Sequence, residues 1–417
     1  MKILLLGSGA REHALARALV NAPETTELVV APGNPGTAMI ATNFAIDPTS
    51  PVEAVELATQ MGADLVVVGP EAPLVAGVAD AVRQAGVPVF GPGAAAARLE
   101  GSKAFAKEVM AAAGVPTATA VVCATPEELS AALDRFGAPY VVKDDGLAAG
   151  KGVVVTSERD AALAHGRSCL ARQGGRVLVE EYLDGPEVSL FCVCDGATVR
   201  PLAPAQDYKR VGDGDVGPNT GGMGSYSPLT WAPADLTEQV VREVAQPVVD
   251  EMARRGTSFT GLLYCGLALT GKGLRVVEFN VRFGDPETQV VLARLTSSLA
   301  QLLHAAATGR LAEVPAPTWR PEAAVDVVLA APGYPGAVTT GGLLTGLDAA
   351  EEVEGVHVLH AGTGFSDDGE LVATGGRVLS VVALGDDVQA ARERAYQAVG
   401  RLGLPGSHYR TDIAAGR

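Results

Sequence analysis

The chain has 417 residues, of which 47% are apolar and only 5% aromatic, and it carries a net charge of −16. This length allows two to four domains, each with a core built mostly from Ala, Val and Leu. The acidic balance argues against a nucleic-acid backbone or an anionic membrane as a partner, so any phosphate binding has to be local.

The five cysteines are an odd number and include no C-x-x-C pair, which argues against a structural zinc site or a disulfide framework. No apolar run approaches the roughly 20 residues that span a bilayer. The N-terminus also lacks the basic region and apolar stretch of a signal peptide. We therefore expect a soluble, cytoplasmic and monomeric protein.

The first hundred residues alternate short apolar runs with helical patterns. Strands are predicted at 2–6, 27–31, 64–69 and 87–91, and helices up to about 21, at 51–61 and at 75–84. This alternation is typical of a parallel sheet with helices on both faces. Ligands of such sheets bind at the carboxyl ends of the strands, where the loops place Gly9, Asn34 and Glu71.

The turn around Gly7 and Gly9 invites comparison with the dinucleotide-binding fingerprint G-x-G-x-x-G. Glu12 occupies its third glycine position, and the second strand ends without the acid that would bind a ribose hydroxyl. These departures argue against a dinucleotide-binding dehydrogenase. The turn is predicted to bind one anion at a helix N-terminus, or none. His13 is interpreted as a polar wall or cap residue.

A glycine-rich hairpin is predicted between Tyr140 and Val155. Its first strand ends in Lys143, and Gly150 and Gly152 let backbone N–H groups approach phosphate oxygens on either side of Lys151. The glycine spacing differs from that of a Walker A loop. The pattern favours triphosphate binding, and ordinary turn chemistry is the alternative.

Two further clusters follow. A strand ending at Glu180 and Glu181 turns and resumes near Glu187, so the backbone of this hinge could pair with an adenine edge and Glu187 could reach ribose hydroxyls. The segment 206–228 is predicted to be a long loop, and loops of this length are usually functional or disordered. Its Lys209 and Arg210, followed by closely spaced glycines, indicate an anion clamp.

The stretch 275–289 carries the strongest chemical signal. Glu278 and Asn280 lie on one face of a predicted strand, because side chains alternate with period two. A carboxylate beside an amide oxygen suits Mg²⁺ or Mn²⁺. Arg282 has the same parity and could hold a phosphate that the metal also touches. The alternative is an edge strand whose polar face is solvated.

The last hundred residues are predicted to form a small α+β domain that caps the site. Strands are expected near 356–361, 371–373 and 377–384, followed by a helix with Ala391 and Ala395 on its inner side. His360 is interpreted as a core or hinge residue. We expect no residue of this domain to be catalytic by itself.

These clusters, in this order, resemble the ATP-grasp ligases and, among them, the phosphoribosylamine–glycine ligase family. The resemblance runs nearly from end to end. It is carried by GSGAREHALA, APGNPGTA, VGPEAPLVAG, EGSKAF, DGLAAGKGV, EEYLDG, DYKRVGD, GPNTGGMGSYSP, EFNVRFGDPETQ, GYPG, HAGT and GGRVL. One departure is Asp144, where the resemblance predicts a small apolar residue. No acid stands on the strand before Glu278, so no ligand is assigned to a second metal.

The resemblance implies an N-terminal parallel α/β domain, an ATP-grasp core of two subdomains and a small C-terminal α+β domain. The boundaries it implies are 1–101, 102–318 (a mobile lid at about 119–188, a main subdomain at 189–318) and 319–417. It also implies that ATP, glycine and 5-phosphoribosylamine give glycinamide ribonucleotide, ADP and phosphate through glycyl phosphate. The alternatives are another ATP-grasp ligase or carboxylase, and a nucleotide sensor without catalysis.

The clusters and the resemblance together give the expected site. Expected to bind ATP are Lys103, Lys143, Gly150, Lys151, Gly152, Glu180, Glu181, Leu183 and Glu187. Expected to bind the other substrates are Gly9, Asn34, Glu71, Asp207, Lys209, Asn219, Thr220, Gly221 and Gly222. Expected catalytic residues are Arg282, Lys151 and Asp285, and Glu278 with Asn280 is expected to hold the metal. Asp285 and Asp207 are the candidates for binding the ammonium group of glycine.

Overall fold

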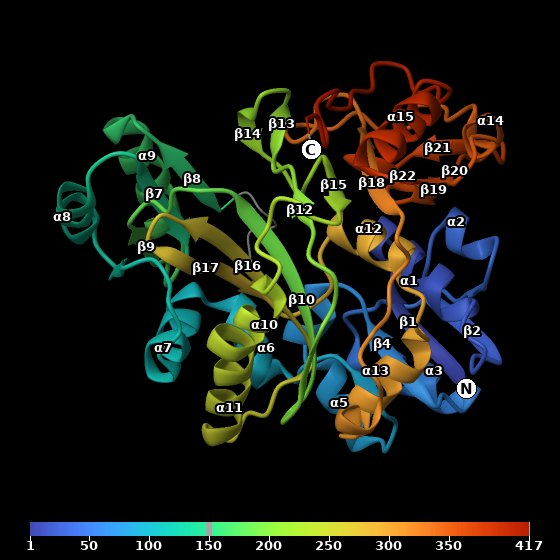
Figure 1. Cartoon of the computed structure of the whole chain (residues 1–417), viewed down its shortest axis with the longest axis horizontal. Helices are drawn as coiled ribbons and strands as arrows, with labels where there is room; N and C mark the ends of the chain where they lie inside the picture. The colour runs from blue at the N-terminus through green and yellow to red at the C-terminus, as the bar shows by residue number, and fades with distance from the viewer. Residues whose placement is uncertain (147–151, 417) are drawn as a thin grey trace.

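The computed structural model describes residues 1–146 and 152–416, arranged in several lobes around a central antiparallel sheet (Figure 1). The N-terminal lobe is a parallel five-stranded sheet in the order β3-β2-β1-β4-β5. Its strands are β1 (Lys2–Gly7), β2 (Glu27–Pro32), β3 (Thr42–Asn43), β4 (Leu65–Val68) and β5 (Val89–Phe90). The predicted parallel sheet is confirmed, and β3 is a short edge strand that the sequence did not reveal.

The helices of this lobe follow the predicted pattern with one exception. Those predicted up to about residue 21 and at 51–61 are α1 (Ala10–Val20) and α3 (Pro51–Met61). The helix predicted near 75–84 is present as α5 (Val78–Gln84), but it begins three residues later, because the chain before it forms the short helix α4 (Glu71–Val75) and a turn. Gly77 separates them with a φ of 83°. This left-handed conformation suits glycine, which has no Cβ to clash.

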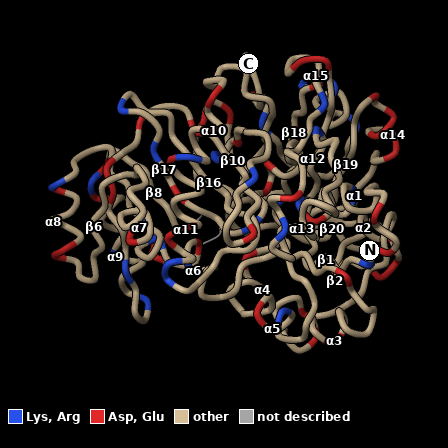
Figure 2. Tube along the Cα trace, turned by 60° about the horizontal axis from the view of Figure 1, so that its bottom comes forward, with Lys and Arg blue, Asp and Glu red and all other residues tan. Residues whose placement is uncertain are grey.

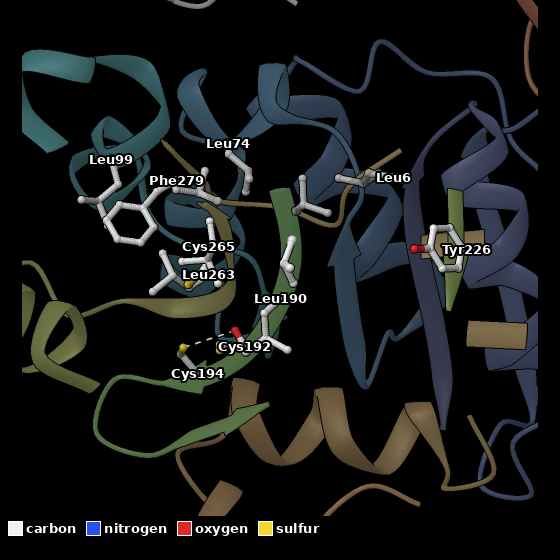
Figure 3. Packing of buried hydrophobic residues seen from close by; sticks show 14 of the residues in the cluster. Leu6, Leu74, Leu99, Leu190, Cys192, Cys194, Tyr226, Leu263, Cys265 and Phe279 are labelled. Carbon is white, nitrogen blue, oxygen red and sulfur yellow. Dashed lines mark hydrogen bonds between the residues drawn. The ribbon is translucent and has the colours of Figure 1, made fainter. Parts of the chain in front are cut away.

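The central sheet has the strand order β11-β10-β16-β17. Its strands are β10 (Glu187–Asp195), β11 (Val199–Pro201), β16 (Thr260–Thr270) and β17 (Gly273–Asn280). α6 (Ala94–Gly101) and α7 (Lys103–Ala113) contact β17, and α13 (Leu299–Ala307) contacts β10 and β16. Phe279 packs close to Leu263 and Cys265 in the core that Figure 3 shows. All five cysteines are free and buried, as expected for packing residues.

The strands and helices around the glycine-rich hairpin form a lobe of their own at the left of Figure 1. Its antiparallel sheet has the order β6-β9-β7-β8. Its elements are β6 (Ala120–Cys123), α8 (Pro126–Phe136), β7 (Tyr140–Asp144), β8 (Val153–Thr156), α9 (Arg159–Leu170) and β9 (Val177–Glu180). β7 pairs antiparallel with β8, so the predicted hairpin is confirmed. The two helices and the sheet enclose a separate hydrophobic cluster that includes Leu129, Val142 and Val179.

The C-terminal sheet has the order β12-β15-β18-β22-β19, which draws strands from two distant parts of the chain. Its strands are β12 (Gln206–Asp207), β15 (Gly224–Ser227), β18 (Ala323–Ala330), β19 (Val356–His360) and β22 (Arg377–Gly385). Between β12 and β15 the chain adds the hairpin β13 (Arg210–Gly212) and β14 (Val216–Asn219). The long loop predicted at 206–228 is therefore wrong. β12 pairs with β15 and β13 pairs with β14 inside this segment, whereas β15 also pairs with β18 about a hundred positions away, which local sequence does not show.

The rest of this lobe agrees with the expectations from sequence. Helix α15 (Val388–Val399) places Ala391, Ala395 and Ala398 at 0% exposure against the sheet.

Basic and acidic residues are interspersed along the chain trace (Figure 2). Among the described residues, none of the helices combines the length and apolar character that a membrane crossing requires.

Two histidines connect the N-terminal and C-terminal lobes. His13 of α1 and His360 of β19 are each 4% exposed, and His13 Nδ1 accepts a hydrogen bond of 3.0 Å from the backbone N–H of His360. The side chain of Asn34 donates to the carbonyl of His360 at 2.9 Å. His13 is therefore a buried contact between lobes, and His360 is a core residue, as expected.

This histidine pair is expected to make the protein acid-labile. Burial lowers the pKa of His13 to about 3 and that of His360 to about 4, so the unfolded chain takes up protons first as the pH falls below 6.5. The stability that the neutral rings contribute above this pH is lost towards pH 4, at roughly 1.4 kcal/mol per pH unit for each ring. Urea unfolding between pH 7 and pH 5 measures this slope. His360→Asn should make this slope shallower by the contribution of one ring, while His13 and His357, whose pKa values burial also lowers, continue to contribute to it.

Candidate active site

A cavity of about 760 Å³ lies where the lobes meet, within the size range of small-molecule sites. The structure brings together here most of the residues predicted from sequence. They are Glu71, Lys103, Lys143, Gly152, Glu180, Glu181, Leu183, Glu187, Asp207, Lys209, Asn219, Thr220, Gly221, Glu278, Asn280, Arg282 and Asp285. The parallel sheet, the hairpin lobe and the central sheet thus contribute to one cavity.

Lys143 and Glu180 form a buried ion pair on the wall that the hairpin lobe provides. They lie on the neighbouring strands β7 and β9, with Lys143 Nζ 2.8 Å from Glu180 Oε2 and 3.0 Å from the carbonyl of Val277. Lys107 Nζ contacts the other oxygen of Glu180 at 3.1 Å. Burial acts to lower the pKa of Lys143, but Glu180 and Glu278 outweigh it and raise this pKa. Lys143 is therefore a fixed cation that faces the cavity.

Glu278 and Asn280 lie at the end of β17, opposite Gly266 and Tyr264 of β16. Both line the cavity, while Phe279 between them is 3% exposed. The predicted common face is thus confirmed. Within the described part of the chain, neither side chain has a hydrogen-bond partner, so their oxygens are open to a cation.

This donor set fits Mg²⁺ or Mn²⁺ in a particular way. Among the described residues, no group of three or more His, Cys, Asp or Glu side chains has the arrangement of a metal site. One carboxylate and one amide oxygen therefore form an incomplete protein shell. Mg²⁺ is commonly bound through one or two carboxylates, with substrate phosphates and water completing its shell. The pair suits a cation that arrives together with a phosphate-bearing substrate.

Arg282 is held between two carboxylates. Its guanidinium lies 3.2 Å from Glu71 Oε2 and 3.2 Å from Glu100 Oε1, and it donates to the carbonyl of Phe283 at 3.2 Å. Burial raises the pKa of Glu100, although Arg282 acts against this shift. These partners fix the orientation of the guanidinium, so its positive charge has a defined position at the cavity wall.

A second charged cluster surrounds Lys209 of the segment predicted to be an anion clamp. Lys209 Nζ lies 2.6 Å from Glu187 and 3.0 Å from Asp207. Nearby, the Tyr264 hydroxyl donates to Glu287 at 2.8 Å. Burial raises the pKa of Asp207 to about 7, with Lys209 opposing the shift and Glu287 and Glu187 adding to it. This corner has an excess of carboxylates and suits a small cationic group.

Asp285 contacts the C-terminal lobe through Arg377. Arg377 lines the cavity with its guanidinium 3.3 Å from Asp285 Oδ2, and it donates to the carbonyls of Gly221 and Asp285 at 2.8 Å each. Although burial opposes the shift, Arg377 lowers the pKa of Asp285. We expected no catalytic residue in the C-terminal domain, yet this domain supplies a charged wall of the cavity.

Some predicted residues lie elsewhere. Gly9, Asn34 and Gly222 do not line the cavity. Asn34 is 6% exposed, and its amide is used by the carbonyls of Ser8 and His360. Gly150 and Lys151 lie outside the described residues.

The cavity also includes charged or polar residues that the sequence analysis did not assign to it. They are Arg11, Glu100, Lys107, Tyr182, Gln206, Asp215, Tyr264, Glu287 and Arg377. Arg11, Glu100 and Arg377 belong to the motifs GSGAREHALA, EGSKAF and GGRVL, so their motifs were visible although their positions in space were not.

Asp144 stands where the resemblance predicts a small apolar residue, and its negative charge is balanced by a neighbouring arginine. Asp144 is 7% exposed and forms an ion pair with Arg172, which lies just after α9. It does not line the cavity, whereas Lys143 before it does. The negative charge at this position therefore faces the interior of the hairpin lobe and its arginine partner.

Comparison with known proteins agrees with this arrangement. Three family models match: the N domain of phosphoribosylglycinamide synthetase over residues 1–100, its ATP-grasp (A) domain over 101–288 and its C domain over 324–416. A phosphoribosylamine–glycine ligase of Streptomyces coelicolor is 63% identical over 417 residues, which is 100% of this chain and 99% of the relative. One of Mycobacterium bovis is 59% identical over 99% of this chain and 97% of its own length.

Solved structures show the same relationship. The phosphoribosylamine–glycine ligase of Thermotoga maritima superposes with a TM-score of 0.86 and 34% identity, covering 99% of this chain and 100% of its own. The biotin carboxylase domain of the Hydrogenobacter thermophilus 2-oxoglutarate carboxylase, at 18% identity and a TM-score of 0.70, covers 98% of this chain and 91% of its own, and shares the fold alone. With three matching domains and full-length relatives of this identity, the chain belongs to the phosphoribosylamine–glycine ligase family.

Proposed function

We propose that this chain uses ATP to join glycine to 5-phosphoribosylamine, giving glycinamide ribonucleotide, ADP and phosphate in purine biosynthesis. The observation that carries the proposal is the single cavity that gathers Lys143, Glu278, Asn280, Arg282 and Asp285. Relatives that match over their whole length are named phosphoribosylamine–glycine ligases. A glycine carboxylate is already ionised at neutral pH, so the first step needs no strong base.

The chemical demand of the first step is to bring two anions together. The glycine carboxylate has to approach the γ-phosphate of ATP, which requires cations and donors around the transferred group. Lys143 and Arg282 are fixed cations at this cavity, and Lys151 is assigned to the same task from the sequence. Glu278 and Asn280 would hold Mg²⁺ or Mn²⁺, and such a cation would supply positive charge that offsets the negative charge of the phosphate groups.

The second substrate pocket follows from the carboxylate-rich corner. Asp207, with its raised pKa, is our first candidate for binding the ammonium group of glycine, because an arriving cation would stabilise its ionised form. Asp285 is the second candidate, and each of the two carboxylates already has a cationic neighbour, Lys209 for Asp207 and Arg377 for Asp285. Asn219, Thr220 and Gly221 form the wall assigned to phosphoribosylamine.

The hairpin lobe is proposed to act as a lid. A mobile segment at about 119–188 would cover the acyl phosphate and exclude water, which would otherwise hydrolyse it before the amine attacks. The separate hydrophobic cluster of this lobe supports the proposal, since it allows the lobe to move as a body. We further propose that the chain acts in the cytoplasm as a monomer, since residues of one chain gather the candidates for ATP, metal and substrate binding in the cavity.

The proposed function is tested by ADP release with Mg²⁺, ATP and glycine, with and without phosphoribosylamine formed in place from ribose 5-phosphate and ammonia. We expect release that requires both glycine and the amine, together with formation of glycinamide ribonucleotide. Omitting the metal should abolish it. Silence with glycine but turnover with bicarbonate or formate would assign the chain to another ATP-grasp reaction.

A further inference from the structure

A second cavity, of about 460 Å³, lies on the other side of α12 (Glu287–Arg294) from the candidate active site. α12 packs against α1 (Figure 1). His357 and Leu359 of β19 and Val382 and Leu384 of β22 line the cavity from the C-terminal lobe. None of the residues assigned above to substrates or metal lines it. The cavity therefore needs an explanation of its own.

Its charge is one-sided. Arg17 of α1, Arg320 and His357 of β19 line the cavity, and of the described residues no Asp or Glu does so. Neither guanidinium forms a hydrogen bond or ion pair with any residue that the structure describes. Burial lowers the pKa of Arg17, and the negative charge of Glu351 opposes this shift. Arg320 is exposed and Arg17 is half-buried, so both guanidinium groups can meet a ligand that enters from solvent.

A buried amide links this cavity to the active site. Gln289 of α12 lines this cavity and is 1% exposed, and its Nε2 donates to Asp285 Oδ1 at 2.8 Å. Its Oε1 has no hydrogen-bond partner among the residues that the structure describes, and because this oxygen has almost no accessible surface it makes no contact with a ligand in the cavity.

We propose that this cavity binds a small phosphate monoester, with Arg17 and Arg320 holding the phosphate. A phosphate monoester carries a charge near −2 at neutral pH, which matches two guanidinium groups. Arginine is suited to bidentate phosphate contacts. The remaining wall combines apolar side chains, such as Leu292 and Leu299, with hydroxyl side chains, such as Ser297, so it can contact both the apolar and the polar parts of the ligand's body.

The ligand would also influence the active site. Gln289 is hydrogen-bonded to Asp285, which lines the larger cavity. Occupation of the second cavity would therefore fix the side chain that orients Asp285. The binding site itself does not depend on the proposed ligase function.

Phenyl phosphate is the probe, and the imidazole proton signals of His357 are the readout, identified by their loss in His357→Asn. Burial, followed by Arg17 and Arg320, lowers the pKa of His357 to about 4, so this ring senses both cations. We expect a saturable shift with a Kd of about 1 mM or tighter. The doubly substituted Arg17→Ala, Arg320→Ala protein should bind at least about tenfold more weakly. Lys143→Met, changed only in the larger cavity, should bind as the wild type does.

Three results would overturn the proposal. One is an unmoved His357 signal in the wild type, and another is equal binding by the doubly substituted protein. The third is an equal loss in Lys143→Met, which would place the probe in the larger cavity. Inorganic phosphate and phenol are run separately, and we expect each to bind more weakly than the ester. Equal binding of inorganic phosphate would overturn the assignment to an ester. ADP release by the doubly substituted protein should remain at the wild-type rate without probe, since neither arginine lines the active site.

Discussion

Replacing Glu278 with alanine is expected to lower turnover by roughly 10³-fold or more while the protein stays folded. The substitution removes the only carboxylate of the Glu278–Asn280 pair, and a bound metal contributes several kcal/mol of charge stabilisation. Glu278 has no structural hydrogen bond within the described chain, so its loss should cost little stability. Initial rates of ADP release at several Mg²⁺ concentrations and direct Mn²⁺ binding measure the two effects separately.

Two further variants, a conservative one and a surface one, serve as controls for this experiment. Glu278→Gln retains an oxygen ligand without the charge and should show weaker Mn²⁺ binding with partial activity at high metal concentration. Glu27→Ala, a surface carboxylate paired with Lys2, should behave as the wild type does. Normal turnover together with unchanged Mn²⁺ binding in Glu278→Ala would disprove the metal assignment.

Replacing Arg282 with methionine should reduce both activity and stability. The change leaves Glu71 and Glu100 without their shared cation, and breaking a buried pair on one side costs about 3–5 kcal/mol. Turnover should fall by roughly 10²–10³, the loss expected for one preorganised charge at the transferred phosphate. Denaturant unfolding and ADP release measure these quantities. The pKa of Glu100 is already raised by burial, so the stability deficit should grow as the pH rises and this carboxyl ionises.

A second substitution separates the structural effect from the chemical one. Glu100→Gln added to Arg282→Met removes the stranded charge and should restore most of the lost stability. It should not restore turnover, because the cation at the cavity is still missing. Recovery of both together would show that Arg282 acts only through folding.

Much of the site could be predicted because the residues of each of its motifs are close together in the sequence. Strand alternation placed Glu278 and Asn280 on one face, and the structure has them lining the cavity on either side of buried Phe279. The hairpin around Lys143 was also readable, since its strands and turn are neighbours in sequence. Lys143 contacts Glu180 because their strands pair, which turns two separate motifs into one charged wall.

The parts that escaped prediction depend on contacts between distant residues. Arg377 reaches Gly221 and Asp285 across more than 90 positions, and no local pattern shows that an arginine in the C-terminal domain faces the active site. Asn34 was predicted to bind substrate because it follows a strand end, but its side-chain amide donates a hydrogen bond to the carbonyl of His360. Lys107 was missed for the same reason, since only the folded chain brings it to Glu180.

The shared sheet of the C-terminal lobe has a consequence for how the chain can be divided. β15 pairs with β12 and with β18, so two strands from the middle of the chain complete a sheet whose other members lie after residue 322. A fragment cut between residues 228 and 323 would expose the edge of β18, and unpaired edges invite association with other chains. The three matching domain models are therefore not three independent folding units. During synthesis, β15 must wait for β18, which lies about a hundred residues further along the chain.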